Sequence, residues 1–393
     1  MTTAKKTIRI AVLGLGWMGQ AHSRSALRIP SLFPDRDFNP VLAVCADTEQ
    51  SRRDRAVNDF GFERATDDWL AAATADDVDA VWVTAPNMLH VPMIEAATAA
   101  GKAVFSEKPI GGKPEQTVQA YRMARDAGVM TGVGYNYLWA PLVLHARDLI
   151  ASGELGDITH YRGRFLSMYG SDELGLLTWR FLMDDAGYGV SSDILSHSVS
   201  MAQFLVGDIT EVVGMRNTTI TERPLPQGAA SHYGRGAVGD PTGPVENEDF
   251  ASMLCRFGNG ATGTFEVSRT VVGPESQNAF EVYGTKGALA WNLEEINELR
   301  YYRKDAGVNA GYTTIFGGDR FAFHGAFAPG QANAIGFEDI VAIEDLEFLR
   351  CVATGETFSP GFAEAVDVVS VQQALITSWD SRTWETVRDL KED

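Results

Sequence analysis

The chain has few cysteines, and they are scattered. Among its 393 residues there are 3 cysteines, Cys45, Cys255 and Cys351, and none forms a Cys-x-x-Cys pair. An odd, dispersed set argues against a disulfide framework and against a zinc site built from thiolates. We therefore expect reduced thiols, a cytoplasmic location and no metal site.

Positive charge and long hydrophobic runs are also scarce. With 33 lysine and arginine residues against 52 aspartate and glutamate residues, the net charge is −19. Nucleic-acid binders need a basic face for phosphate, and anionic membranes attract basic segments. The longest apolar runs, such as 8–17, fall short of the roughly 18–20 residues of a membrane span. We expect neither nucleic acid nor a membrane as a partner.

The first third of the chain alternates short apolar runs with stretches of helical periodicity. This alternation predicts a parallel, doubly wound sheet, which is an α/β Rossmann domain over residues 1–134. The expected strands are 8–13, 41–46, 80–84, 103–105 and 129–133, and the expected helices are 18–28, 49–60, 92–100 and 114–127.

The pattern changes after residue 134. Successive short strands follow, with hairpin signals at Asn259-Gly260 and at 284–287. They predict an antiparallel sheet in an α+β domain over residues 135–393. A helix at 190–205 and two terminal helices at 338–353 and 363–378 complete it. Two long loops, 224–244 and 306–334, are of a length that is usually functional or faces a partner.

A glycine motif, Gly14-Leu15-Gly16-Trp17-Met18-Gly19, follows the first expected strand and opens a helix. In this context the pattern predicts dinucleotide binding, with the pyrophosphate at the helix N-terminus. Gly14 would allow the tight turn, Gly16 would let the backbone approach the pyrophosphate, and Gly19 would let helix and sheet pack closely. Trp17 and Met18 belong to the same candidate cofactor site.

Asp47 ends the second expected strand, where an acidic residue binds the adenosine ribose hydroxyls and repels a 2′-phosphate. It lies further from the glycines than the usual ~20 residues. The stretch 29–40, with three prolines, indicates an inserted loop that accounts for the excess. Arg52 and Arg53 could instead hold a 2′-phosphate, although arginines in a helix usually form a solvated face. The sequence predicts NAD, with NADP as the weaker alternative.

Two further strand ends carry candidate residues, because ligands of open α/β sheets bind at the carboxyl edge. The segment 84–90 offers Thr84, Pro86, Asn87 and His90 as cofactor contacts, and a plain turn explains it equally well. Glu107 and Lys108, before a proline, follow the next strand. A surface turn is the usual reading of such a pair. At this edge, however, the ammonium would point into the crevice and favour alkoxide character in a substrate oxygen.

Asp193 and His197 are spaced i, i+4, which places both side chains on one face of a continuous helix. A histidine that titrates near neutrality suits proton removal from an alcohol. An amphipathic helix with a satisfied histidine is the ordinary alternative. A metal site is weaker still, because no third ligand follows at suitable spacing.

Together these motifs resemble the glucose–fructose oxidoreductase, inositol dehydrogenase and rhizopine-catabolism family (Gfo/Idh/MocA), over essentially the whole chain. The resemblance implies a Rossmann domain followed by an α+β domain with an open antiparallel sheet, through which we expect a homo-oligomer, a dimer or tetramer. It also implies the catalytic set. His197 would be the acid/base, Lys108 would polarise and position the hydroxyl, and Asp193 would orient the substrate or the histidine.

Within the family, the segments 161–165, 178–181, 257–261 and 283–287 are most similar to levoglucosan dehydrogenases and related sugar dehydrogenases. Many relatives carry an arginine after Tyr-Asn-Tyr, where this chain has Leu138 and Trp139. The segment 187–192 is also less rich in glycine than usual. The further candidates for substrate contact are Tyr135, Asn136, Trp179 and Arg180.

The sequence therefore predicts an NAD-dependent dehydrogenase. It would oxidise a ring secondary hydroxyl of a sugar, a levoglucosan-like anhydrosugar, a glycoside or a cyclitol to the ketone. Two alternatives share the fold: a glycosidase that retains NAD, and a catalytically silent NAD-binding regulator. Net accumulation of NADH is expected only of the dehydrogenase, and it would distinguish this function from the glycosidase and from the regulator.

Overall fold

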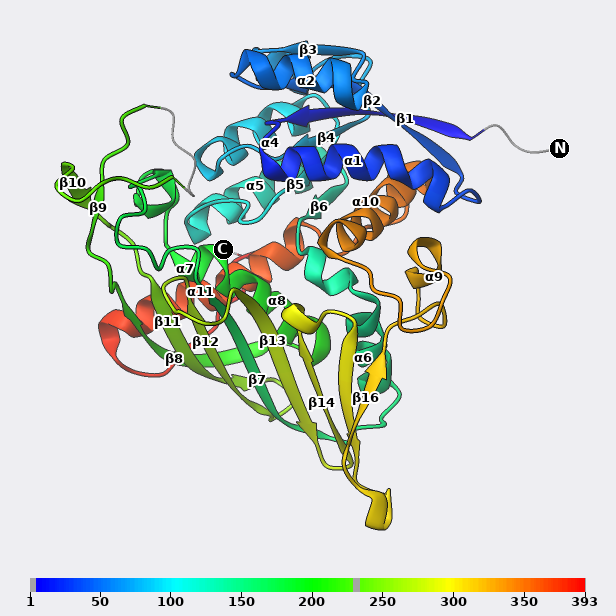
Figure 1. Ribbon diagram of the computed structural model, residues 1–393, viewed down its shortest axis with the longest axis vertical. Coiled ribbons are helices and arrows are strands. Elements are labelled where there is room, and N and C mark those ends of the chain that lie inside the picture. The colour runs from blue at the N-terminus through cyan, green and yellow to red at the C-terminus, as the bar shows by residue number, and fades with distance from the viewer. Residues whose placement is uncertain (1–4, 229–233, 393) are drawn as a thin grey trace.

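Six parallel strands form the first sheet of the computed structural model, which describes residues 5–228 and 234–392 (Figure 1). Their order is β3-β2-β1-β4-β5-β6. The strands are β1 (Lys6–Leu13), β2 (Phe38–Ala46), β3 (Arg64–Thr66), β4 (Ala80–Val83), β5 (Ala103–Ser106) and β6 (Thr131–Val133). The helices between them are α1 (Trp17–Leu32), α2 (Gln50–Phe60), α3 (Trp69–Ala73), α4 (His90–Ala99) and α5 (Pro114–Ala127). The expected Rossmann topology is confirmed; β3 and α3 were missed because segments this short carry no readable period.

The expected inserted loop at 29–40 is wrong. Helix α1 continues through Pro30 to Leu32, and β2 already begins at Phe38. Pro40 is tolerated in β2 because β3 pairs with that strand only from Val44 onward, so Pro40 has no neighbour on that side. The larger number of residues between the glycines and Asp47 is therefore taken up mainly by the long helix α1 and by the nine residues of β2.

Nine strands form the second sheet, in the order β16-β15-β14-β13-β7-β12-β11-β8-β17. They are β7 (Ile158–Ser167), β8 (Ile209–Asn217), β11 (Phe250–Phe257), β12 (Thr262–Ser268), β13 (Ser276–Gly284), β14 (Gly287–Asn292), β15 (Glu298–Arg303), β16 (Tyr312–Phe316) and β17 (Glu385–Thr386). Both expected hairpins are present, between β11 and β12 and between β13 and β14. The sheet is mixed rather than purely antiparallel, because β7 and β12 pair in parallel after a long crossover.

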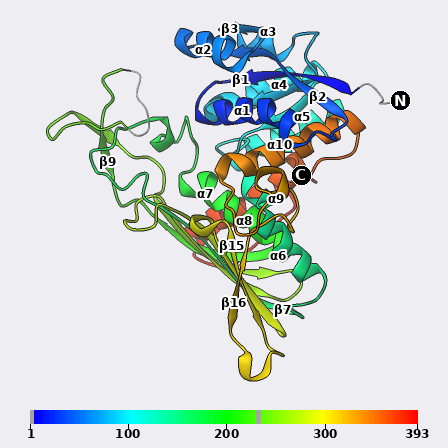
Figure 2. The same cartoon turned by 45° about the vertical axis from the view of Figure 1, so that its right-hand side comes forward.

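Helices cover one face of this second sheet. They are α6 (Pro141–Ala151), α8 (Leu195–Leu205) and α11 (Phe362–Ser381). The other face is open, as the side view of the sheet shows (Figure 2). Along β11 and β12 buried and exposed residues alternate, and Leu254 is 50% exposed on the open side. The short ribbon of β9 (Glu222–Pro224) and β10 (Thr242–Pro244) stands away from the sheet.

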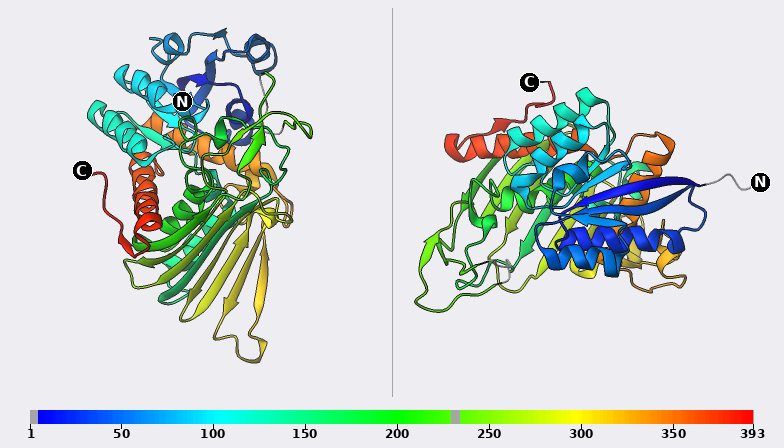
Figure 3. Two further views of the ribbon diagram at one scale, coloured as in Figure 1. Left: turned by 90° about the vertical axis from the view of Figure 1, so that its left-hand side faces the viewer. Right: turned by 90° about the horizontal axis from the view of Figure 1, so that it is seen from above.

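Helix α10 (Phe337–Thr354) returns to the first domain from the far end of the chain. It lies against α1 (Figure 3). Its Phe348 and Leu349 share a hydrophobic core with Ile8 and Ile10 of β1. The expected domain boundary at residue 134 stays a prediction. It coincides with the end of β6, but α10 completes the first core from beyond it.

Among the helices of the described ranges, none has the length and apolar character needed to cross a membrane.

Candidate active site

The glycine motif has the local geometry of a nucleotide loop. Gly14 has φ 97°, and a Cβ on Gly19 would lie 2.0 Å from the Gly14 carbonyl oxygen. A Cβ on Gly16 would meet no heavy atom within 4 Å. Gly14 and Gly19 therefore serve the turn and the helix–sheet approach, whereas Gly16 borders open space. Helix α1 begins there with no acidic residue in its first turn and no side-chain cap, which suits an anion such as a pyrophosphate.

Asp47 lies beside this loop at the carboxyl end of β2. Its Oδ2 accepts a hydrogen bond of 2.7 Å from the Leu15 backbone N–H, and the residue is 8% exposed. Arg52 Nη1 lies 3.4 Å from the same oxygen. The other arginine, Arg53, donates to the carbonyl oxygens of Asp47 and Thr48 at 2.7 and 2.9 Å. Arg53 is thus held by the backbone, while the Asp47 carboxylate faces the loop, an arrangement that fits ribose rather than a 2′-phosphate.

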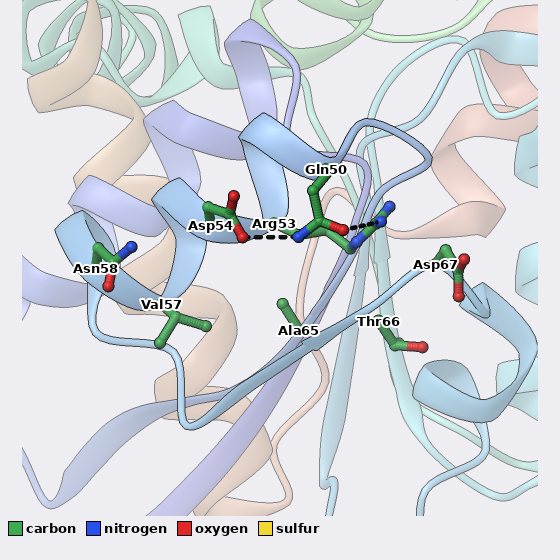
Figure 4. A pocket seen from close by; sticks show the side chains of 8 residues that line it. All are labelled: Gln50, Arg53, Asp54, Val57, Asn58, Ala65, Thr66 and Asp67. Atoms are coloured by element: carbon green, nitrogen blue, oxygen red, sulfur yellow. Dashed lines mark hydrogen bonds between the residues drawn. The ribbon is translucent and has the colours of Figure 1, made fainter.

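A surface hollow of about 560 Å³ lies between α2 and β3 (Figure 4). Arg53 lies at its wall, hydrogen-bonded to Gln50, which in turn donates to Asp54. Of the residues singled out in the sequence, Arg53, the alternative ligand of a 2′-phosphate, lines this hollow.

The segment after β4 connects the glycine loop to the next strand end. Thr84 Oγ1 donates a 2.6 Å hydrogen bond to the Gly14 carbonyl oxygen. His90 is 1% exposed, and its ring nitrogens lie 2.7 Å from the Ala85 carbonyl oxygen and 2.9 Å from that of Pro109. His90 thus joins two loops next to the expected cofactor site, and its contact with the cofactor stays a prediction. Asn87, in a turn after Pro86, lies 3.4 Å from the Ala186 carbonyl oxygen of the second domain.

Lys108 and Asp193 are brought together across the two domains. The Lys108 ammonium donates to the backbone oxygen of Asp193 at 2.8 Å and to its Oδ1 at 2.9 Å. Their side chains are 17% and 18% exposed. The two residues are 85 positions apart in the chain, so this pair is a product of the tertiary fold.

Asp193 has two more polar neighbours. The Tyr169 hydroxyl donates to its Oδ2 at 2.8 Å, and Arg180 Nη1 lies 3.7 Å from the same atom. Burial by itself would raise the pKa of Asp193, but the charges of Lys108 and Arg180 and the hydrogen bonds outweigh it and hold the pKa well below its ordinary value. The carboxylate is therefore ionised. The Arg180 guanidinium also stacks on Trp179, 4.6 Å from the ring centroid.

His197 lies among aromatic rings, and it does not share a continuous helix with Asp193. The helix is interrupted at Ile194, between α7 (Val190–Asp193) and α8 (Leu195–Leu205). The prediction that both side chains lie on one face of a continuous helix is therefore wrong. No hydrogen bond recorded for the described residues joins the two side chains, because Asp193 turns toward Lys108. His197 is 5% exposed, with the Tyr137 ring centroid 4.6 Å away.

The electrostatic surroundings keep His197 neutral. Burial, and secondarily the Lys108 ammonium, lower its pKa well below the ordinary value, against the opposing effect of Asp193. A neutral imidazole can accept a proton, which is the chemistry a base requires.

The other residues expected from the sequence lie around this centre. Tyr135 is 3% exposed, with its ring centroid 5.9 Å from that of His197. The buried side-chain nitrogen of Asn136 has no hydrogen-bond partner among the described residues. Trp17 is 60% exposed and stacks on Phe337 of α10 at 5.1 Å.

A buried cluster that holds the substrate-side segments was not predicted from the sequence. Asn247 donates to the carbonyl oxygens of Arg180 and Gly187 at 3.1 and 2.9 Å. Arg269, 1% exposed, binds Asn247 and Asp249 at 2.7 Å each. Tyr169 was missed as well. These residues lie just before or just after strands. There the alternation of apolar and polar residues does not distinguish a buried polar side chain from an exposed one.

Among the described residues, no group of three or more His, Cys, Asp and Glu side chains has an arrangement that could hold a metal ion.

Comparison with known proteins gives one consistent result. Residues 8–135 match an oxidoreductase family with an NAD-binding Rossmann fold, and residues 143–290 match the GFO/IDH/MocA C-terminal domain. The chain is 32% identical to the levoglucosan dehydrogenase of Pseudarthrobacter phenanthrenivorans, over 98% of this chain and 99% of that protein. It is 27% identical to a scyllo-inositol 2-dehydrogenase (NAD(+)) of Bacillus subtilis, over 72% of this chain and 73% of that protein. A solved levoglucosan dehydrogenase in complex with NADH and L-sorbose superposes with a TM-score of 0.92 at 31% identity, covering 98% of this chain and 100% of that one.

Proposed function

The chain belongs to the GFO/IDH/MocA family of NAD-binding oxidoreductases, and we propose that it oxidises a ring secondary hydroxyl of a sugar, anhydrosugar, glycoside or cyclitol to the ketone. The observation that carries this proposal is the contact of Lys108 with Asp193 near the buried His197, at the carboxyl edge of the Rossmann sheet. Bound NAD supplies the acceptor for the hydride that leaves the carbinol carbon.

The side chains divide the remaining work. His197 Nδ1 or Nε2 accepts the hydroxyl proton, because its ring is neutral. The Lys108 ammonium donates a hydrogen bond to the same oxygen and stabilises the negative charge that develops on it. Asp193 holds the ammonium in place through two contacts of 2.8 and 2.9 Å from Lys108 Nζ to its backbone and side-chain oxygens.

The cofactor contacts follow from the loop geometry. The pyrophosphate would lie over Gly16, where no side chain intrudes, against the backbone that opens α1 at Trp17 and Met18. Asp47 would bind the adenosine ribose. Thr84 and His90 would hold the loops around the cofactor rather than touch it with their bonded polar atoms.

The substrate class is supported by the relatives and by the aromatic residues around His197 and Arg180. A levoglucosan dehydrogenase and a scyllo-inositol dehydrogenase are both similar to this chain, so an anhydrosugar and a cyclitol are the first candidates. A pyranose has apolar C–H faces and polar hydroxyls, which match the rings of Tyr135 and Trp179 and the polar head of Arg180.

We also propose a homo-oligomer through the open face of the second sheet. Leu254 and Met215 are 50% and 57% exposed on neighbouring strands of that face. Light scattering of the protein with Leu254→Glu would test it; a wild-type monomer contradicts it.

The decisive experiment is a screen of anhydrosugars, hexoses, glycosides and cyclitols with NAD, read by the absorbance of NADH. We expect stoichiometric NADH and ketone with at least one substrate, and loss of the signal in Lys108→Ala. Release of free sugar from a glycoside without net NADH would instead indicate the NAD-retaining glycosidase. Binding of NAD with no turnover of any substrate class would indicate the silent regulator.

A further inference from the structure

His22 of α1 lies between two carboxylates in the interior. The residue is 0% exposed; its Nδ1 is 2.9 Å from Asp345 Oδ1 and its Nε2 is 3.0 Å from Glu107 Oε1. A neutral imidazole has a single N–H, so two hydrogen bonds to ionised carboxylates require the doubly protonated ring. Burial alone would lower the pKa of His22, but the two carboxylates outweigh it and raise the pKa well above its ordinary value.

Glu107 connects His22 to the catalytic lysine. Its Oε2 accepts a 3.2 Å hydrogen bond from the backbone N–H of Lys108, and its own N–H donates to the Val83 carbonyl oxygen at 2.9 Å. A Cβ at Gly134 would lie 3.0 Å from Glu107 Oε2, so the missing side chain leaves space for the carboxylate. The position of Glu107 therefore defines where the Lys108 backbone, and hence its ammonium, is placed.

We propose that His22 and Asp345 are positioning residues for Lys108. Asp345, from helix α10 near the end of the chain, holds the His22 imidazolium. The imidazolium fixes Glu107, and Glu107 fixes the backbone of Lys108. The inference rests on the catalytic role of Lys108 under the proposed function. It gives α10 a task in catalysis besides completing the hydrophobic core of the first domain.

The neighbouring Glu344 provides a matched control on the same helix. It is also 0% exposed, and it interacts by hydrogen bonding with the side chain of Trp139 rather than with His22 or Lys108. Burial, followed by the charges of Glu107 and Asp345, raises its pKa well above the ordinary value. A raised pKa favours the uncharged acid, so glutamine is the replacement that matches it best in charge and shape.

An exposed ion pair joins the same two helices and provides a second control. Arg24 Nε donates to Glu338 Oε2 at 2.8 Å, with the two side chains 33% and 35% exposed. Arg24→Gln weakens the contact between α1 and α10 without touching Glu107.

The test compares steady-state kinetics and NAD binding in four proteins: wild type, Asp345→Asn, Glu344→Gln and Arg24→Gln. A small displacement of a catalytic group can cost up to about 10²-fold in rate. We expect Asp345→Asn to lower kcat by about 10- to 100-fold, with the Kd for NAD and the KM for the sugar changed much less. The two controls should remain within about twofold of wild type.

The outcomes separate positioning from packing. An equal loss of kcat in Glu344→Gln and Asp345→Asn would mean that any change in α10 disturbs the enzyme, and would overturn the proposal. So would full activity in Asp345→Asn while Lys108→Ala is inactive, and in that case the proposed function would stand. Wild-type turnover in Lys108→Ala would instead refute the proposed function at its source.

A spectroscopic measurement tests the bridge independently of turnover. The chain has 7 histidines, and NMR of protein labelled at the histidine ring nitrogens distinguishes protonated from bare nitrogens. We expect one ring with both nitrogens protonated at neutral pH, and its signals should be lost in His22→Gln. A bare nitrogen on His22 would overturn the assignment even in a fully active enzyme.

Discussion

Replacing Lys108 with alanine tests the arrangement of charge around His197. The Lys108 ammonium contacts the Asp193 carboxylate at 2.9 Å, and after burial it is the second cause of the low pKa of His197. The substitution therefore acts on the rate and on the pH dependence through one atom.

The rate effect should be large and the stability effect moderate. A group that donates to the developing alkoxide contributes about 10²–10⁴-fold, so kcat/KM should fall by that factor. Asp193 retains its 2.8 Å hydrogen bond from Tyr169 and the nearby Arg180, so we expect a loss of about 1–3 kcal/mol in the free energy of unfolding. The variant should remain folded and bind NAD.

The pH dependence gives the sharper test. Oxidation requires neutral His197, so kcat/KM falls as the pH drops through the pKa of that ring, which gives the pH profile an acidic limb. In the wild type the midpoint of this limb should lie well below the ordinary histidine pKa of about 6.5. Lys108→Ala removes a charge that lowers the pKa, so the limb should move to higher pH. Asp193→Asn removes a charge that raises the pKa, so the limb should move to lower pH.

The assay is kcat/KM as a function of pH for the wild type and both variants. Lys286→Ala, on the exposed turn between β13 and β14, controls for the loss of one positive charge and should leave the profile unchanged. His197→Ala should remove the limb. Shifts in the same direction for the two variants would refute the electrostatic reasoning. A limb that survives in His197→Ala and vanishes in Lys108→Ala would make the lysine the base.

Asp47→Ser should raise the ratio of kcat/KM with NADP to that with NAD, since the carboxylate that repels a 2′-phosphate is gone; an unchanged ratio would contradict its role. Gly19→Ala should lower the free energy of unfolding by about 1–3 kcal/mol, because its Cβ would lie 2.0 Å from the Gly14 carbonyl oxygen. Gly16→Ala should instead keep the Tm and weaken NAD binding, as its Cβ enters open space; equal Tm values for the two variants would argue against this distinction. Arg269→Met should cost about 3–5 kcal/mol in denaturant unfolding, because the buried Asp249 carboxylate loses its cation and keeps hydrogen bonds from the backbone N–H groups of Thr219 and Ile220; a cost below about 1 kcal/mol would mean that the pair is not stabilising.

Local features of the fold were readable from the sequence because their causes are local. The three glycines follow an apolar strand, and the space around each matches the task assigned to it. The hairpin at Asn259-Gly260 was predictable for the same reason, since the residue at φ 90° is a glycine. Lys108, Asp193 and His197 were candidates from their local positions, and the family resemblance implied their catalytic roles. Nothing in the spacing along the chain indicates that Lys108 meets Asp193.

Partners distant in the chain were decided by the tertiary structure alone. Periodicity reports that one face of a segment is buried, but it does not say which segment covers it. His22 and Asp345 are 323 positions apart, and neither looks different from a solvated polar residue until α10 packs on α1. The i, i+4 rule likewise does not predict the interruption of the helix at Ile194, since Asp193 binds Lys108 of the other domain. The sequence by itself thus determined the Rossmann topology and the nucleotide loop. The charge pairing around Lys108 was decided by the packing of α1, α7 and α10 against the sheet edge, since buried charges take the partners that packing places beside them.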